Sequence, residues 1–140
     1  MFLEALKLYS EGVISRVART LNESPSPMAG IQTLFDEMTA GVGSKAGAMG
    51  CFMVNSVAEL APYDSDVTEI AAAYSDALQR LLTEALTPAA VPGTVTRKQT
   101  PEQLAAYVFN AMQGIRILIK SGATREQVQA ISAITLNSVQ

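Results

Sequence analysis

The chain has 140 residues, which suits a single domain with one hydrophobic core over residues 1–140. Its net charge of −3 and its lack of a Lys and Arg cluster argue against DNA binding by this chain alone. The absence of histidine and the single cysteine exclude Ser-His-Asp and Cys-His catalysis, His-ligated metals and an intramolecular disulfide. An unpaired thiol, no signal peptide and no apolar run near the roughly 20 residues of a membrane span predict a cytoplasmic protein without a membrane partner.

Hydrophobic spacing predicts two helices in the first part of the chain. Steps of four and three residues mark the buried face of a helix over residues 2–22, formed by Phe2, Leu6, Tyr9, Val13 and Val17. Ser26 is expected to cap a second helix that begins at Pro27. The buried face of this second helix consists of Ile31, Leu34, Phe35 and Met38, and it ends at Gly41 to Ser44.

Two further helices are expected in the middle of the chain. Four glycines between residues 41 and 50 predict a flexible loop or a weak helix start. A third helix follows over about 48–61, with an inward face of Phe52, Met53, Val57 and Leu60. Asp64 or Asp66 then caps a long fourth helix, which stops at Pro88 to Gly93. The inward face of the fourth helix comprises Val67, Ile70, Tyr74, Leu78, Leu81 and Ala85.

Two capping boxes, Thr100 with Gln103 and Thr124 with Gln127, mark the starts of the last two helices. The fifth helix carries an apolar stripe of Leu104, Val108, Ala111, Ile115 and Leu118, and the sixth carries Val128, Ile131, Ile134 and Thr135. The segment 91–96 is β-prone, but it contains Pro92 and Gly93 and has no partner strand. The sequence therefore predicts an all-α domain of six helices.

The stripe on the fifth helix repeats every seven residues, which is typical of close helix packing. Two copies of the last helical hairpin, related by a two-fold axis, would form a dimeric four-helix bundle. The interface of this predicted homodimer comprises Leu104, Val108, Ala111, Ile115, Leu118, Val128, Ile131 and Thr135. The alternative is that the stripe packs only within its own domain. Gly114 lies in the middle of the fifth helix, where the close approach of another helix would explain a glycine.

Three segments resemble the ligand-binding domain of TetR-family transcriptional regulators. The segment 50–61 has the pattern G-C-x-x-x-N-x-x-x-E of the central helix in many members, and it ends before Pro62. The segment 2–9 is similar to the first helix after the family's DNA-binding head, and 121–124 is similar to the turn of its dimerisation hairpin. The resemblance extends over essentially the whole chain.

The resemblance implies an orthogonal and antiparallel six-helix bundle that binds a small-molecule effector and forms a homodimer. It also implies a helix-turn-helix head of roughly 45–50 residues that this chain lacks, so that DNA is bound only through that missing domain. Members are mostly bacterial repressors, and no cofactor is expected. One alternative is a headless helical dimer that acts as an adaptor for other proteins. Another is an enzyme, for which the sequence offers no catalytic motif.

Candidate ligand contacts are bulky apolar residues on inward faces, with a few polar groups near them. The flexible methionine side chain adapts to ligands of irregular shape, so the methionines favour a pocket for a mainly apolar ligand. Asn55 lies one turn from Glu59, and for Asn55 the alternative to ligand contact is hydrogen bonding between helices or exposure to solvent. Arg116 could pair with an anionic ligand, pair with Glu59 or stay exposed. The predicted ligand-binding residues are Phe35, Met38, Phe52, Met53, Asn55, Ser56, Tyr74, Met112, Gln113 and Arg116.

Cys51 is expected at the start of the third helix, where backbone amides favour the thiolate form. One interpretation is a redox or electrophile sensor within the same family. The other is a small, partly buried side chain that packs like an apolar residue. We favour the second interpretation, because no basic residue except Lys45 lies near Cys51 in the sequence.

Overall fold

The computed structural model describes residues 1–87 and 98–140, and within these ranges the chain is helical and has no strand. Six of the helices there have nine residues or more, and they confirm the predicted all-α class. The β-prone segment 91–96 lies outside the described residues. The helices are α1 (Phe2–Glu23), α2 (Pro27–Ala40), α3 (Lys45–Met49), α4 (Phe52–Leu60), α5 (Ser65–Leu86), α6 (Pro101–Lys120) and α7 (Arg125–Val139).

The predicted capping residues begin four of these helices. The Ser26 hydroxyl accepts a hydrogen bond from the backbone N–H of Ala29, with Pro27 at the first position of α2. Asp64 accepts from the N–H groups of residues 66 and 67, so Asp64 and not Asp66 caps α5. Thr100 and Thr124 each form a complete capping box, with the glutamine three residues later bonding back to the threonine N–H.

The region before α4 differs from the single helix predicted over about 48–61. A short helix, α3, occupies 45–49, and α4 begins only at Phe52. Gly50 separates the two with φ +79°, a left-handed conformation that interrupts the helix and that glycine adopts without strain. The Ser44 hydroxyl accepts a hydrogen bond from the N–H of Gly47, which gives α3 a capped start of its own.

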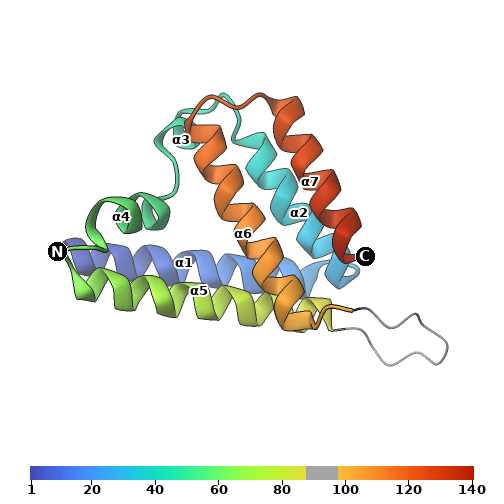
Figure 1. The fold of residues 1–140 in the computed structure, drawn as a ribbon, viewed down its shortest axis with the longest axis horizontal. Coiled ribbons are helices and arrows are strands. Elements are labelled where there is room, and N and C mark those ends of the chain that lie inside the picture. Colours follow the sequence, from blue (N-terminus) through green and yellow to red (C-terminus); the bar gives the residue numbers. More distant parts are fainter. Residues whose placement is uncertain (88–97) are drawn as a thin grey trace.

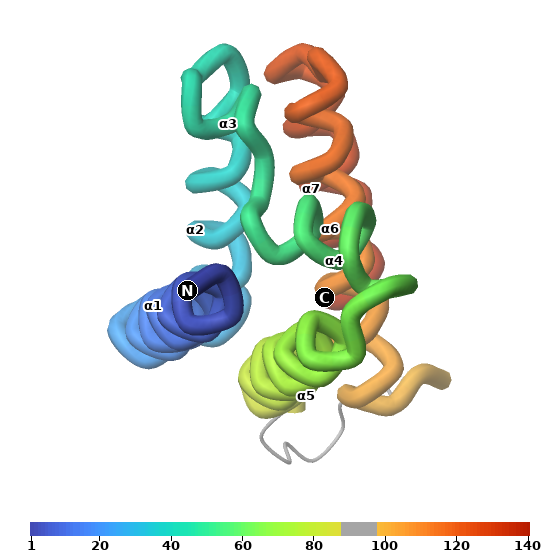
Figure 2. Tube along the Cα trace, turned by 90° about the vertical axis from the view of Figure 1, so that its left-hand side faces the viewer, coloured from blue at the N-terminus to red at the C-terminus, as the bar shows by residue number. Residues whose placement is uncertain are grey.

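The helices form two groups that cross one another (Figure 1). The long helices α1 and α5 lie side by side and run in the same direction, and Figure 2 shows both nearly end-on. The second group, α2, α6 and α7, rises from this pair. Further contacts place α4 against α1 and α5, and α3 against α6. The chain thus descends from α3 to α4 along one side of α6.

The hydrophobic core fills the space between the two groups of helices. Its largest fully buried side chains are Tyr74 of α5 and Phe35 of α2, and the Tyr74 ring meets Phe109 of α6 edge-on at 6.5 Å between ring centres. Leu6 and Ile31 are also fully buried. Within 1–87 and 98–140, no helix has the combined length and apolar character that crossing a membrane requires.

Candidate functional site

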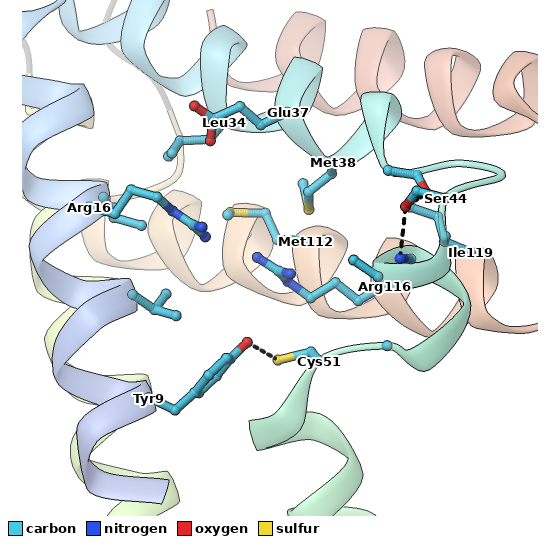
Figure 3. Close-up of a pocket in the computed structure, with 16 residues that line it drawn as sticks. Tyr9, Arg16, Leu34, Glu37, Met38, Ser44, Cys51, Met112, Arg116 and Ile119 are labelled. Atoms are coloured by element: carbon cyan, nitrogen blue, oxygen red, sulfur yellow. Dashed lines mark hydrogen bonds between the residues drawn. The ribbon is translucent and has the colours of Figure 1, made fainter. Parts of the chain in front are cut away.

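A cavity of about 300 Å³ lies where α1, α2 and α6 meet the segment that carries α3 and Cys51 (Figure 3). This volume is at the lower end of the range of about 300–1,000 Å³ that is usual for small-molecule sites. Arg16, Glu37 and Ala46 belong to the lining and are exposed, so the cavity opens to solvent on their side. The arrangement can hold a small organic molecule.

One wall of the cavity is a single face of α1. Tyr9, Val13, Arg16 and Val17 follow one another at spacings of four, three and one residues, which places them on the same side of the helix. Val13 and Val17 are buried and connect the cavity to the core, whereas Arg16 is exposed. The wall therefore combines apolar surface with a charge.

The opposite wall is formed by the end of α2 and by α3, which lie against each other. Leu34 and Met38 of α2 give it an apolar surface. Gly47 of α3 lies directly on the backbone of Gly41, where an added Cβ would collide with the Gly41 carbonyl oxygen. The glycines that sequence analysis assigned to a loop or a weak helix start therefore allow α3 to pack closely and to form part of the lining.

Tyr9 and Cys51 meet at the base of the cavity. The Tyr9 hydroxyl and the Cys51 sulfur lie 3.1 Å apart, and either group can donate the hydrogen bond. Burial, and next the hydrogen bond from Cys51, raises the pKa of the Tyr9 phenol well above its usual range. Cys51 is 3% exposed and immediately precedes α4, as predicted. Tyr9 and Cys51 therefore place a hydroxyl group and a sulfur atom on the lining of the cavity.

Three of the ten predicted ligand contacts line this cavity: Met38, Met112 and Arg116. Others belong to the surrounding core, where Phe35, Met53 and Tyr74 are buried. Phe52 packs edge-on against the rings of Phe2 and Tyr9, each at 5.6 Å. The Ser56 hydroxyl donates to the carbonyl of Phe52 within α4, and Gln113 is half-buried outside the lining.

Asn55 follows the alternative interpretation, in which it bonds between segments of the protein. Its Nδ2 donates to the Met49 carbonyl at 2.9 Å, and its Oδ1 accepts from Lys120 Nζ at 3.0 Å. These contacts join α4 to the end of α3 and to the end of α6. Asn55 is not among the lining residues, because its amide is turned toward these partners. Glu59, its neighbour one turn later, is exposed.

None of the four α1 residues in the lining was among the predicted ligand contacts. Tyr9, Val13 and Val17 were assigned to the buried face of the first helix, and Arg16 was not singled out. A signal was present, because Arg16 lies three residues after Val13 and immediately before Val17. A charged side chain at the border of an apolar stripe is well placed to reach into a cavity at the edge of the core. Missed lining residues outside α1 include Leu34, Glu37, Ser44 and Ile119.

The stripe predicted to form a dimer interface is divided between two environments. Leu104, Val108, Ile115, Val128 and Thr135 are buried within the chain itself, while Ala111 and Ile131 are half-buried. Leu118 is 41% exposed. The large apolar side chains that α6 and α7 leave exposed are Tyr107, Ile117, Leu118 and Ile134.

The described residues contain no group of three or more His, Cys, Asp or Glu side chains that could hold a metal ion. Comparison of the chain with protein-family models, with curated proteins and with solved structures finds no match. Any assignment of function must therefore rest on the sequence motifs and on the cavity.

Proposed function

We propose that this chain is the effector-sensing and dimerisation domain of a bacterial TetR-type transcriptional regulator, and that it binds a small, mainly apolar molecule. The observation that carries the proposal is the cavity of about 300 Å³ between α1, α2 and α6, with Val13, Met38 and Met112 on its lining. The G-C-x-x-x-N-x-x-x-E pattern of residues 50–59 supports the family assignment.

The position of α1 supports a mechanism for sensing. In a regulator of this type, the first helix of the sensing domain follows the DNA-binding head, and α1 provides four of the lining residues. An effector that binds more tightly to one position of α1 than to another shifts the population of the two states. Two heads in a dimer would then change their spacing on an operator, which is the property that half-site recognition depends on.

The outer face of α6 supports the proposed homodimer. Tyr107, Ala111, Gly114 and Leu118 follow at spacings of four, three and four residues, so they share one side of the helix. None of the four is buried in the chain. Ala111 and Leu118 have apolar side chains, and Tyr107 contributes an aromatic ring. Pairing this face with its copy about a two-fold axis would remove that surface from water.

Native mass spectrometry of the purified protein tests effector binding and dimerisation together. We expect the mass of a dimer, carrying a co-purified small molecule or taking one up from a chemically diverse panel. A monomer at micromolar concentration that binds no member of the panel would contradict the proposal.

The DNA-binding part of the proposal concerns the gene. We expect a helix-turn-helix segment encoded in frame directly before Met1. An in-frame stop codon immediately upstream of Met1 would instead favour the headless adaptor.

A further inference from the structure

Two guanidinium groups face the same cavity from different helices. Arg16 extends from α1 and Arg116 from α6, and Figure 3 shows the two groups pointing toward one another. Like charges that face one another destabilise each other, and the solvent that reaches the exposed Arg16 reduces this repulsion without removing it. In the described part of the chain, the Nε atom of Arg116 is also buried without a hydrogen-bond partner, which costs free energy.

The rest of the lining does not balance these two charges. Glu37 provides the one carboxylate among the lining residues, and its side chain is exposed on α2. In Figure 3 it lies beside Leu34 at the edge of the cavity. The lining is therefore positive on balance, although the chain as a whole has a net charge of −3. A negatively charged occupant would relieve both the repulsion and the missing hydrogen bond.

We infer that the cavity binds an organic carboxylate with an apolar body, whose carboxylate group lies between Arg16 and Arg116. The inference rests on the proposed function, since it assumes that the cavity holds an effector, and it adds the chemical class of that effector. A planar guanidinium forms paired, charge-assisted hydrogen bonds with a carboxylate. The carboxylate would also provide the acceptor that Arg116 Nε lacks.

The rest of the lining indicates the chemical character of the ligand beyond its carboxylate group. Most of it is apolar: Val13, Val17, Leu34, Met38, Met112 and Ile119. An inorganic anion would leave this surface in contact with water, and a neutral apolar molecule would leave the two guanidinium groups without a partner. A small amphipathic carboxylate satisfies both parts of the lining, and the volume of about 300 Å³ limits it to a compact molecule.

Such an anion would connect two helices that do not pack extensively against each other. The extensive contacts of α1 are with α2, α4 and α5, whereas those of α6 are with α2, α3, α5 and α7. A carboxylate held by Arg16 and Arg116 joins α1 to α6 across the cavity. The charge of the effector, and not only its size, would then determine the position of α1.

Isothermal titration calorimetry with matched probes tests this inference on the purified protein. The probes are hexanoate, octanoate and decanoate, each beside the alcohol and the amine of the same chain length, together with acetate as an anion without an apolar body. We expect at least one carboxylate to bind at least about tenfold more tightly than its alcohol, as expected for charge-assisted hydrogen bonds. The amines and acetate should show no detectable binding.

Substitution of each arginine identifies the groups that hold the carboxylate. Arg16→Met and Arg116→Met keep an unbranched apolar stem, and each should weaken binding of the carboxylate about tenfold or more while leaving alcohol binding unchanged. Arg19→Met is the matched control, because Arg19 lies one turn further along α1, is exposed and is not part of the lining. Its thermal unfolding and its affinity for the carboxylate should match those of the wild-type protein.

The possible failures are distinguishable. If an alcohol binds as tightly as its carboxylate and both arginine variants bind like wild type, the inference is overturned and the proposed effector site remains. Equal loss of carboxylate binding in Arg19→Met would show association with surface charge, which also overturns it. If no probe of any class binds and native mass spectrometry finds no small molecule, the proposed function fails together with the inference.

Discussion

The inner and outer faces of α6 are covered very differently. On the inner face, Leu104, Val108 and Ile115 pack in the core, and Arg116 lines the cavity. On the outer face, an apolar surface that includes Leu118 is left partly exposed. The apolar side chains of the inner face are packed, but the buried Nε atom of Arg116 has no hydrogen-bond partner among the described residues. No described segment of the chain fully covers the apolar side chains of the outer face.

This difference indicates two kinds of partner for one helix. A guanidinium whose Nε lacks a hydrogen-bond partner within the described chain, in a cavity of about 300 Å³, is suited to a small anion. The outer face of α6 is apolar and carries no ionised group, so it is suited to pack against another apolar surface of similar extent. The two faces can therefore be tested separately, by substitutions that affect one of them and leave the other unchanged.

The largest loss of stability is expected from a substitution at an almost completely buried position on the inner face of α6. Ile115 is 1% exposed, and Ile115→Ala should lower the free energy of unfolding by about 2–5 kcal/mol through lost contacts and a new cavity. The control, Ile117→Ala, changes a side chain that is 51% exposed, and it should alter stability by less than about 0.5 kcal/mol. Urea denaturation at low protein concentration measures both. Equal losses would show that the two faces do not differ in burial.

A second test uses the tyrosine buried beneath the inner face. Burial, followed by the electrostatic effect of the nearby Cys51 side chain, raises the pKa of Tyr74 to about 12, against the opposing effect of Arg116 and Arg16. Above pH 10 the unfolded chain loses the phenol proton while the folded protein keeps it, so stability decreases as pH rises. By pH 12 the loss attributable to Tyr74 should be about 2 kcal/mol.

Comparison of two phenylalanine variants isolates this contribution. Tyr74→Phe should show a smaller decrease in the free energy of unfolding between pH 9 and pH 12 than the wild-type protein. Tyr63→Phe changes an exposed tyrosine and should keep the full decrease. Parallel pH profiles for the wild-type protein and Tyr74→Phe would contradict the assignment of the raised pKa to burial of Tyr74.

The helices themselves could be predicted from the sequence because local signals specify them. Ser26, Asp64, Thr100 and Thr124 act within a turn or two of their own position, and all four cap the helices that they were expected to cap. The break at Gly50 was not predicted, and part of what favours glycine there is distant in the sequence: besides the φ of +79°, a Cβ at this position would lie 3.0 Å from the side chain of Lys120.

The cavity could be predicted only in part, for a related reason. Inward-facing residues are recognisable from periodicity, but periodicity does not separate those that pack together from those that line a space. Met38 and Phe35 lie on the same predicted face, yet only Met38 lines the cavity. Arg16 was missed because its role depends on Arg116, which lies 100 residues further along the chain.

A smaller loss of stability is expected from removing the cap at the start of α7, the second helix of the hairpin. Thr124 accepts a hydrogen bond from the N–H of Gln127 at 3.2 Å, and Thr124→Ala should cost about 1 kcal/mol of unfolding free energy. Thr33→Ala is the control, because the Thr33 hydroxyl donates to the Ala29 carbonyl inside α2 and caps nothing. Thermal unfolding of the two variants compares them directly. A Thr33→Ala loss as large as that of Thr124→Ala would show that the cap has no special contribution.

The smallest change in stability is expected from replacing a helical glycine by alanine. This substitution also distinguishes most sharply between an outer face of α6 that is open and one that a second copy covers. A Cβ added at Gly114 of α6 or at Gly12 of α1 would meet no atom within 4 Å, so neither glycine is required by packing inside the chain. Alanine at either position should therefore stabilise the isolated chain by about 0.5–1 kcal/mol, because glycine is unfavourable within a helix. Gly12→Ala should keep this gain at every protein concentration.

Gly114→Ala should behave differently once two copies associate, because an added methyl group would separate two helices that approach closely at this glycine. We expect a weaker dimer by analytical ultracentrifugation, together with the full gain in stability at concentrations where the protein is monomeric. The opposite signs of these two effects cannot come from the chain alone, in which position 114 is open. An unchanged dissociation constant would place the partner of α6 elsewhere, and Leu118 would then lie outside the contact between copies.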